Sequence, residues 1–515
     1  MTRDRRESVI AAAELAGVLG PIEGGWRYNG SFGAVLDAGA REFRPQRSGI
    51  IARLSTTLKL LRERAWLRLI STRSQRLFLQ FGLPWTAALL VGLVAVLYAR
   101  WSEDLYEVFI GWIQGRVYLA LAITPALTVV SVFLTRRWFS GSEGSGIPQV
   151  IAALHAPPDR EHTLMKRLFG IRVIVGKLGV SLLGFLGGLT IGREGPTVHI
   201  GAAIMAETRR FYPRRSPRLE RQLLLAGAAA GLSGAFNTPL ASIIFAIEEL
   251  ARDFEGRTNG TMITAVVFSG LTSLALAGNY LYFGQINVPN TFHSEFILPV
   301  LLAALACGLL GAAFNWALLN WERWMPQPMR EWRGHKPLLY AFLMGLVVAG
   351  LGIATHGQTW GSGYDQARQL LEGRNPITQS YALAKWGAMV VSYLTGIPGG
   401  LFSPSLSIGA GIAQWVHLAF AWAPMASMIA LCMTGYLAAV TQSPLTSFVI
   451  VMEMTNGTGL VIPMMATALL ASRFSGLFTR PLYEALAEKN YFPMVPGYRS
   501  EPKPPAPSDD SFDTL

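Results

Sequence analysis

Charged residues are scarce in this sequence. Of its 515 residues, 15% are charged and 51% are hydrophobic, and the mean hydropathy is +0.35. Soluble domains have about 25% charged residues, so this composition excludes a chain of soluble domains. A helix needs roughly 20 apolar residues to cross a bilayer. We predict membrane helices in the apolar stretches that carry no charge, at residues 84–99, 298–321, 338–355 and 427–452.

Cysteine is also scarce, and an uninterrupted signal-peptide core is lacking. Only Cys307 and Cys432 occur, each inside an apolar stretch, so the sequence predicts neither a disulfide framework nor a metal site. Glu14 and Glu23 interrupt the weakly apolar start of the chain, where a signal peptide would have a continuous apolar core. We therefore expect the N-terminus to be retained in the cytoplasm.

Positive charge is concentrated before the first apolar stretch. The net charge is +12 and the isoelectric point is about 9.8, which in a soluble domain would indicate a nucleic-acid partner. Many of the Lys and Arg residues instead lie at 41–76, as the positive-inside rule expects of a cytoplasmic segment. The predicted partner of this charge is the membrane lipid surface, and not nucleic acid.

The apolar residues divide the chain into three predicted parts. Residues 1–80 form a basic cytoplasmic segment, in which 60–81 have the pattern of an amphipathic helix on the membrane surface. Residues 81–490 form the transmembrane domain. Residues 491–515 are rich in Pro, Ser and Asp and are predicted to be a disordered cytoplasmic tail. We expect no soluble regulatory domain after the membrane part.

Three motifs recur in the same order in the two halves of the transmembrane domain, 81–285 and 290–490. The pairs are GSGIPQ at 144–149 with GSGYDQ at 361–366, GREGPTVHIG at 192–201 with GLFSPSLSIG at 400–409, and AFNTPLASIIFAIEEL at 235–250 with VTQSPLTSFVIVMEMT at 440–455. Repeated halves that Gly and Pro interrupt at matching positions are typical of membrane transporters, whose substrates bind at the repeat interface.

The motifs GSGIP, GREGP and GGLFSP each have the pattern of a helix start. Gly precedes the start and Pro lies in the first turn, as this geometry requires. The start of a helix offers unpaired N–H groups and about half a positive charge. Several starts aimed at one point bind an anion without a full cation. The motifs therefore predict broken or re-entrant helices around an anion site.

Comparison of the two copies separates candidates for the fold from candidates for the chemistry. Glu248 faces Glu453, so both are predicted to have a structural role such as capping a helix or tying loops. Glu194 is aligned with Phe402 of the other copy, and Glu249 is aligned with a methionine. A carboxylate within a membrane segment is costly and usually marks a pathway or a proton relay. Glu194 and Glu249 are therefore the predicted functional carboxylates.

Other readings of the polar residues remain open at this stage. Glu194 is alternatively an interfacial residue paired with Arg193. The hydroxyl of Ser145 suits an anion, but a helix-capping serine is more common. Lys177 either attracts anions or extends to an interface. Tyr483 by itself is indistinguishable from an aromatic residue of the membrane interface.

Taken together, GSGIP, GREGP and GGLFSP resemble the signature motifs of the CLC family of chloride channels and chloride/proton antiporters. The resemblance extends over about residues 80–490 and includes Gly176-Lys177, AFNTPL, IEEL and RPLY. It implies an all-α, polytopic membrane fold with an inverted-topology repeat of about eighteen helices, many of them short, tilted or re-entrant. It also implies a homodimer without a cofactor, in the bacterial inner membrane, with both termini cytoplasmic.

The resemblance implies roles for individual residues. The central chloride would be bound by the hydroxyl groups of Ser145 and Tyr483 and by the backbone N–H groups of Leu401 and Phe402. The backbone of Arg193 and Gly195 would form the outer site. The backbone of Gly144 and Gly146 would form the inner end of the path. Lys177 would give electrostatic support.

The two functional carboxylates also have counterparts in the family. Glu194 matches the gating glutamate, which blocks the outer part of the anion path and accepts protons. Glu249 matches the inward-facing glutamate that passes protons to and from the cytoplasm. The resemblance therefore favours chloride/proton antiport over a passive chloride channel, voltage- or pH-gated, of the same fold.

A remote alternative is an intramembrane serine protease. GLSG at 231–234 lies in an apolar run and resembles a nucleophile motif. Such an enzyme needs a base close to Ser233. His417 lies in a downstream apolar run, and nothing in the sequence places it near that serine.

Overall fold

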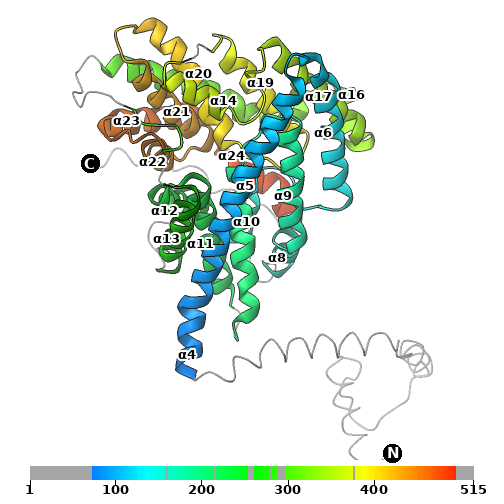
Figure 1. Cartoon of the computed structure of the whole chain (residues 1–515), viewed down its shortest axis with the longest axis vertical. Helices are drawn as coiled ribbons and strands as arrows, with labels where there is room; N and C mark the ends of the chain where they lie inside the picture. Colours follow the sequence, from blue (N-terminus) through cyan, green and yellow to red (C-terminus); the bar gives the residue numbers. More distant parts are fainter. Residues whose placement is uncertain are drawn as a thin grey trace, which may run out of the picture. The chain divides into compact units, whose positions relative to one another are not determined.

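A computed structural model of the chain describes most of the predicted transmembrane domain (Figure 1). The described residues are 72–156, 161–213, 216–252, 260–278, 281–286, 296–374 and 377–494. The predictions for the basic segment up to residue 71 and for the tail from 495 lie outside these ranges. The first residues of the predicted disordered tail, 491–494, are described and include the short helix Phe492–Met494, so there the prediction of disorder is wrong. Within them the secondary structure is helical, with two isolated β-bridges and no β-strand, which confirms the all-α prediction.

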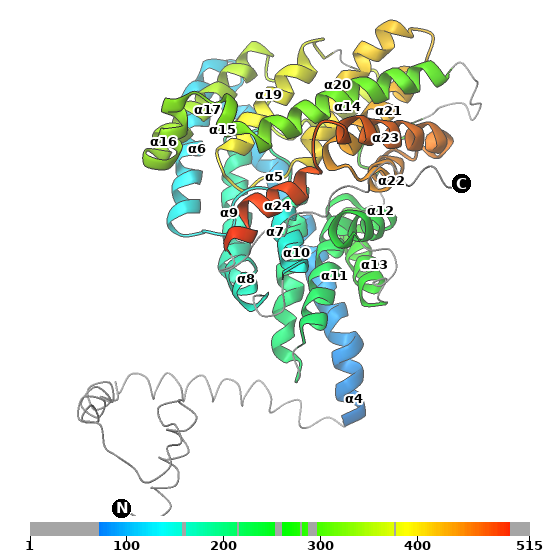
Figure 2. The same ribbon diagram turned by 180° about the vertical axis from the view of Figure 1, so that it is seen from behind.

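The two halves contain the same order of helices (Figures 1 and 2). The first half has α5 (Leu83–Ile113), α6 (Ala120–Arg137), α7 (Ile147–Leu154), α9 (Ile171–Leu186), α10 (Glu194–Glu207), α11 (Pro217–Phe236), α12 (Pro239–Phe245) and α13 (Gly260–Ala277). Their counterparts are α14 (Ile297–Leu319), α17 (Pro337–Ala354), α18 (Tyr364–Leu371), α19 (Tyr381–Leu394), α20 (Phe402–Ala419), α21 (Met425–Thr441), α22 (Pro444–Thr455) and α23 (Val461–Gly476). Packing matches the order, since α5 contacts α11 and α13 as α14 contacts α21 and α23.

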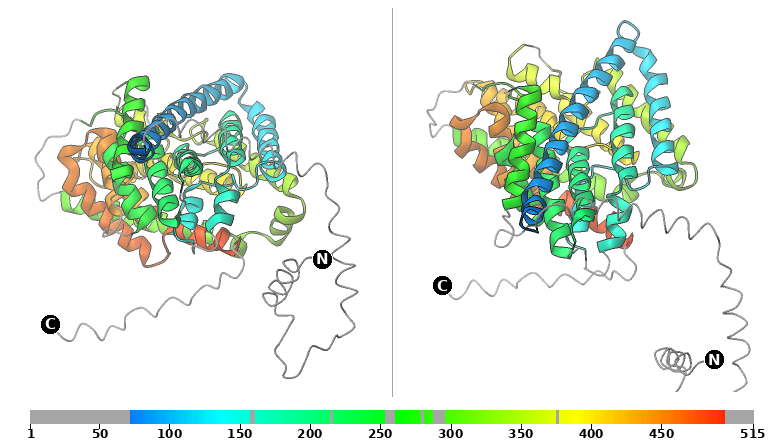
Figure 3. Two further views of the ribbon diagram at one scale, coloured as in Figure 1. Left: turned by 90° about the horizontal axis from the view of Figure 1, so that it is seen from below. Right: turned by 60° about the horizontal axis from the view of Figure 1, so that its bottom comes forward.

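Shorter elements connect and flank these helices. They are α4 (Thr72–Leu77), η2 (Phe78–Gly82), η3 (Val117–Leu119), α8 (Glu161–Leu168), η4 (Thr208–Phe211), η5 (Ala246–Ala251), α15 (Trp321–Trp324), α16 (Gln327–His335), η7 (Thr458–Leu460), α24 (Leu482–Asn490) and η8 (Phe492–Met494). The halves meet where α6 packs on α17 and where α12 packs on α22. Figure 3 shows α5, in blue, running past the helices of the first half.

Seven helical stretches among the described residues are long and apolar enough to cross a membrane. They are Phe78–Ile113, Val117–Arg137, Leu164–Leu186, Gly260–Ala277, Ile297–Leu319, Pro337–Ala354 and Thr458–Gly476. In each stretch at most 50% of the apolar window is buried inside the molecule, so the remaining apolar surface is available to lipid or to another subunit. Three predicted spans, at 84–99, 298–321 and 338–355, fall almost entirely within these helices.

The predicted span at 427–452 is not one helix. α21 ends and α22 begins within it, because Gln442 adopts a left-handed conformation (φ 58°) and Pro444 starts the next helix. The first half breaks in the same way between α11 and α12, at Asn237 (φ 56°) and Pro239. A proline has no N–H to continue the preceding helix. The sequence repeat therefore specifies the same break twice.

Two matched helix pairs, α10 with α11 and α20 with α21, form the interior. α11 is buried from Leu223 to Phe236, and α21 from Ser427 to Thr441. A Cβ atom added to Gly201 or Gly227 would lie 2.3 Å from a backbone oxygen of the facing helix. Glycine lets the two backbones touch, as is usual where membrane helices pack closely.

Glu248 and Glu453, which face each other in the sequence repeat, cap helices of opposite halves. Glu248 accepts hydrogen bonds from two backbone N–H groups in the first turn of α22, at 2.6 and 3.0 Å. Glu453 accepts two from the first turn of α12, at 2.7 and 3.2 Å. A carboxylate at a helix N-terminus also interacts favourably with the helix dipole. The structural role predicted for this pair is confirmed.

We expect Glu453→Ala to lower the free energy of unfolding by about 1–3 kcal/mol, because it leaves two N–H groups of α12 without their acceptor. Unfolding in detergent micelles, followed by circular dichroism, measures the loss. Glu331→Ala removes a carboxylate from the exposed surface of α16 and should change stability by less than about 0.5 kcal/mol. Equal stability of the two variants would contradict the capping role.

Candidate functional site

The starts of α10 and α20 are joined across the two halves. Gly192 N donates to Gly400 O at 2.7 Å, and Gly400 N donates to Gly192 O at 2.6 Å. These two glycines are equivalent positions of the repeat, so the exchange is symmetric about a local two-fold axis. The first turns of the two helices are therefore held next to each other, although 208 residues separate them in the sequence.

The start of α7 joins the same place through its GSG turn. Gly144 exchanges backbone hydrogen bonds of 3.1 and 3.2 Å with the segment that leads into α20. Gly146 has φ 107°, which residues with a side chain rarely adopt. A Cβ atom on Gly195 would lie 2.2 Å from Ser145 Oγ. The structure thus brings together the residues predicted from the first two motifs.

Two predicted hydroxyl ligands are buried beside these helix starts. Ser145 Oγ and Tyr483 Oη have no hydrogen-bond partner in the described part of the chain. α24, which carries Tyr483, packs on α7, and the tyrosine ring stacks on Phe402 with centroids 6.1 Å apart. Leu401 caps α20 and Phe402 begins it, so their N–H groups lack an intrahelical acceptor. Hydroxyl and N–H donors of this kind fit an anion.

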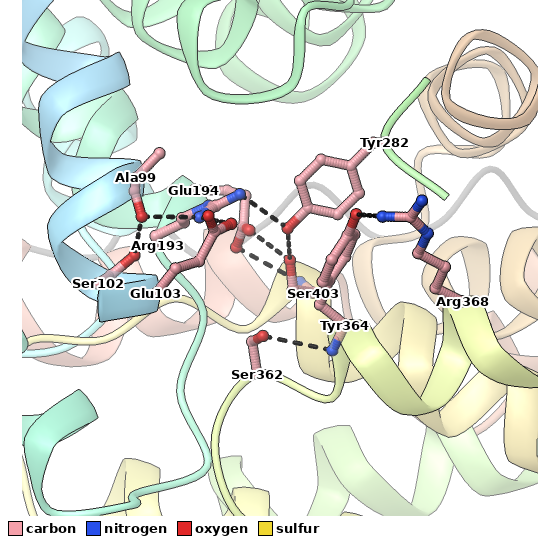
Figure 4. Close-up of polar contacts among 10 residues, drawn as sticks. All are labelled: Ala99, Ser102, Glu103, Arg193, Glu194, Tyr282, Ser362, Tyr364, Arg368 and Ser403. Carbon is pink, nitrogen blue, oxygen red and sulfur yellow. Dashed lines mark hydrogen bonds and ion pairs between the residues drawn. The ribbon is translucent and has the colours of Figure 1, made fainter. Parts of the chain in front are cut away.

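Glu194 is the first residue of α10 and is fully buried (Figure 4). Its carboxylate accepts one hydrogen bond from Ser403 Oγ and another from Ser403 N, the latter at 3.4 Å. Ser403 lies in the first turn of α20, where helix geometry favours an anion. A carboxylate of one half therefore occupies a helix start of the other half. This position is inside the protein, which rules out the interfacial reading of Glu194.

The side chain of Arg193 anchors the turn that carries Glu194. It forms an ion pair with Glu103 of α5, at 2.5 Å, and donates to Ala99 O at 3.0 Å. It also donates to Tyr282 Oη at 3.4 Å, with the guanidinium 5.4 Å from the centre of that ring. Figure 4 shows these contacts next to Glu194. The arginine is thus tied to α5, while the backbone at 193–195 faces α7 and α20.

Two cavities lie beside Arg193. Their volumes are about 170 and 310 Å³, and Tyr282 lines both. The larger one is also lined by Arg100 and Arg368. Clustered positive charge on the walls of a cavity raises the local concentration of anions. The larger cavity, with three arginines and one carboxylate (Glu103), therefore suits the approach of an anion, whereas in the smaller cavity Arg193 faces Glu103, Glu107 and Asp365.

Glu249 lies in η5 and is 1% exposed. Ser443 Oγ donates to its Oε2 atom, and its Oε1 atom has no partner among the residues described. A cavity of about 730 Å³ reaches Ser443 and is also lined by Glu248 and Arg252. One serine therefore separates a buried carboxylate from a large cavity, which suits proton exchange with water in that cavity.

Two buried lysines hold the GSG turns of the two halves. Lys177 is fully buried, and its Nζ donates to Gly144 O at 2.9 Å, so it does not extend to an interface. Lys385 Nζ donates to the three successive carbonyls at 359–361, at 2.9–3.3 Å. Lys385 follows Lys177 by 208 residues, the offset of the GREGP motif pair. Aligning the copies beyond the motifs would have revealed it.

Sequence reasoning missed three further residues. Ser403 faces Gly195 in the other copy, so the comparison that singled out Glu194 contained the signal for it. Ser443 is aligned with a threonine of the other copy. Because both copies have a hydroxyl at this position, the comparison does not single it out. Tyr282 lies outside the repeated motifs, and only the folded chain brings it to the site.

The residues of the protease hypothesis have other surroundings. Ser233 Oγ donates to the backbone carbonyl of Val266 at 3.1 Å, which ties α11 to α13. His417 lies in the last turn of α20.

The two cysteines form no disulfide. Cys307 Sγ donates to the backbone carbonyl of Cys432 at 3.4 Å, and both thiols are free. Across the described ranges, no group of three or more His, Cys, Asp or Glu side chains is placed to hold a metal ion.

The fold and the site together define a class of protein. Broken helices from two repeated halves meet at a buried centre, with N-termini and hydroxyls turned toward it and a carboxylate at one helix start. This is the architecture of transporters built from repeats, and the chain is an integral membrane protein of that class.

Residues 127–476 match the family model described as voltage gated chloride channel. The H(+)/Cl(-) exchange transporter ClcA of Yersinia pestis is 30% identical over 411 residues, which cover 73% of this chain and 82% of that protein. The protein of the same name from Klebsiella pneumoniae is 29% identical over 430 residues, 78% of this chain and 86% of that one. The chain belongs to the voltage gated chloride channel family, and the resemblance to CLC proteins is confirmed.

Solved structures show the same fold. A slow cyanobacterial Cl⁻/H⁺ antiporter superposes with a TM-score of 0.66 at 23% identity, over 79% of this chain and 97% of that chain. A CLC-type fluoride/proton antiporter gives a TM-score of 0.67 at 20% identity, over 81% of this chain and 99% of that chain.

We expect Lys385→Met to lower the free energy of unfolding by about 2–4 kcal/mol, because it leaves three buried carbonyls without a donor. Lys177→Met should have a similar effect in the first half. Thermal unfolding in detergent measures both. Lys166→Met, at an exposed position of α8, is the matched control. If Lys385→Met proved as stable as this control, the hydrogen bonds from Lys385 would not stabilise the GSG turn.

Proposed function

We propose that this chain exchanges chloride for protons across a membrane, with Glu194 as the gate and Glu249 as the internal proton carrier. One observation carries the proposal: the carboxylate of Glu194 is fully buried and hydrogen-bonded at the start of α20. A site that holds a carboxylate can hold a chloride in its place once the carboxylate is protonated and leaves, since helix N-termini favour negative charge.

The neighbouring hydroxyls support a chloride path at this point. Ser145 Oγ and Tyr483 Oη would donate to a central chloride, together with the N–H groups of Leu401 and Phe402. The backbone at 193–195 would bind chloride when Glu194 moves away, and the turn at 144–146 would form the inner end. Lys177 supports the path by holding that turn, and when protonated it also attracts chloride.

The surroundings of Glu249 support a separate route for the proton. Its carboxylate is buried, yet Ser443 beside it lines a large cavity. Chloride needs hydrogen-bond donors, whereas a proton needs acceptors such as this carboxylate, so the two ions can follow different paths. A passive channel has no need of a second buried carboxylate. This feature, and the exchange activity in the names of the relatives, favour antiport over the channel alternative.

We further propose that the protein is a homodimer in a bacterial inner membrane, with one anion path in each subunit and both termini in the cytoplasm. Family resemblance supports the dimer, and the basic residues at 41–76 support a cytoplasmic N-terminus. The predicted division into 1–80, 81–490 and 491–515 belongs to the same proposal.

Reconstitution into liposomes tests the exchange. An imposed chloride gradient should drive protons against their own gradient, and we expect Glu249→Gln to keep chloride flux while lowering proton flux at least about tenfold, because a neutral amide cannot carry the proton. Glu248→Gln, which alters the capping neighbour, should stay coupled. Chloride flux without any proton movement in the wild type would overturn the antiport proposal in favour of a channel.

We expect Glu194→Ala to leave chloride flux that no longer depends on pH between about 4 and 7.5, because the group whose protonation opens the path is gone. Proton coupling should be lost in the same variant. Chloride efflux from liposomes at a series of pH values measures the first effect, and a pH electrode the second. A variant that stays coupled would refute the gating role.

A further inference from the structure

We propose that Ser403 and Tyr282 form a chain of hydroxyl groups that holds the unprotonated Glu194 in the anion path. Both are positioning residues, acting on the gate and not on chloride itself. The proposal rests on the function proposed above and adds what sets the balance between the closed and the open gate. Figure 4 shows the residues concerned.

Each hydrogen bond in this series of hydroxyl groups is donated in the direction of the Glu194 carboxylate. Ser403 Oγ lies within hydrogen-bond distance of Glu194 Oε1 and donates to it. Tyr282 Oη lies 3.3 Å from Ser403 Oγ, and it must donate there because the serine proton is already directed at the carboxylate. Arg193 donates to Tyr282 Oη at 3.4 Å. A donor sequence that begins at a cation and ends at a carboxylate stabilises the negative charge.

The two hydroxyl residues are themselves held firmly. Ser403 is 1% exposed and Tyr282 is 2% exposed. The ring of Tyr282 packs edge-to-face on Phe236 and on Tyr364, with centroid distances of 5.0 and 4.7 Å. Burial and ring packing leave the tyrosine little freedom. Its hydroxyl therefore stays near Ser403 when the gate opens, ready to receive the carboxylate again.

Other charged and titratable groups also surround Glu194. They are Arg193 beside it in the chain, Glu103 of α5 beyond that arginine, and the tyrosines Tyr98, Tyr282 and Tyr483. Arg193 favours the ionised carboxylate and Glu103 offsets part of that effect. The hydroxyl of Ser403 makes the direct side-chain contact. Its removal should therefore shift the gate without disturbing the ion pair.

The serine side chain is an addition to the site and not a requirement of the fold. The backbone N–H of Ser403 already donates to Glu194, and any residue except proline would supply it. The equivalent position in the other copy is Gly195, which has no side chain to offer. Ser403 thus adds a second donor to the half that receives the carboxylate, and so strengthens the closed state.

Chloride binding and chloride efflux against pH test the proposal. Ser403→Ala should move the pH of half-maximal efflux upward by about one unit, because the carboxylate loses a charge-assisted hydrogen bond and binds a proton more readily. Tyr282→Phe should move it the same way by about half as much. At pH 7.5 both variants should bind chloride several-fold more tightly in calorimetry, since the carboxylate competes less well.

Two controls isolate the hydroxyl chain. Ser405→Ala removes a buried hydroxyl of the same helix that has no partner among the described residues. Tyr364→Phe removes a hydroxyl from the same aromatic cluster, where it accepts a bond from Arg368. Neither should move the pH profile. In a Glu194→Gln background, Ser403→Ala should leave chloride affinity unchanged, because the competing carboxylate is absent.

The outcomes separate this proposal from the one it rests on. A wild type with pH-dependent exchange, in which Ser403→Ala and Tyr282→Phe both keep the wild-type pH profile and chloride affinity, would overturn the hydroxyl chain alone. A wild type without chloride binding or exchange would overturn the proposed function. Should Ser403→Ala fail to fold, Tyr282→Phe, which keeps the ring packing, decides the question.

Discussion

The reciprocal hydrogen bonds between Gly192 and Gly400 hold the two halves together where their helices begin. A Cβ atom at Gly400 would lie 3.0 Å from the Gly192 oxygen and from the Gly195 nitrogen, so a side chain there would push these backbone atoms apart by a few tenths of an ångström. Because the paired residues are equivalent in the repeat, the contact places the local two-fold axis at the site. Glu194 reaches Ser403, and Gly195 reaches the GSG turn of α7, only because this contact fixes the two helix starts side by side.

Symmetry in this molecule supports the fold, and departures from symmetry carry the chemistry. Glu248 and Glu453 cap helices of opposite halves in the same way, and Lys177 and Lys385 hold the two GSG turns in the same way. Glu194 has no counterpart of its kind. Duplicated backbone therefore supplies helix starts from both sides, and under the proposed function the single carboxylate of Glu194 would make the anion site responsive to protons.

Local sequence patterns predicted the parts of the structure that depend on local physics. Uncharged apolar stretches identified spans, and Gly and Pro identified helix starts, because lipid requires satisfied backbone groups and proline ends a helix. The same local reasoning failed at 427–452, where hydropathy is continuous but Gln442 turns left-handed and Pro444 begins a new helix. Lys385 was missed because only the motifs of the two copies were compared, although it follows Lys177 by the same 208 residues as the GREGP pair; which carbonyls it binds depends on the folded chain.

The sequence by itself determined that this chain lies in a membrane and that its fold is duplicated. It also determined that Glu194 and Glu249 are each aligned with a residue that carries no carboxylate in the other copy. Only the tertiary structure decided what these carboxylates touch. Ser403 lies 209 residues from Glu194 in the sequence, and Tyr282 comes from a segment outside the repeated motifs. Hydropathy and turn residues act over a few neighbours, whereas these hydrogen bonds exist only after the two halves have packed against each other.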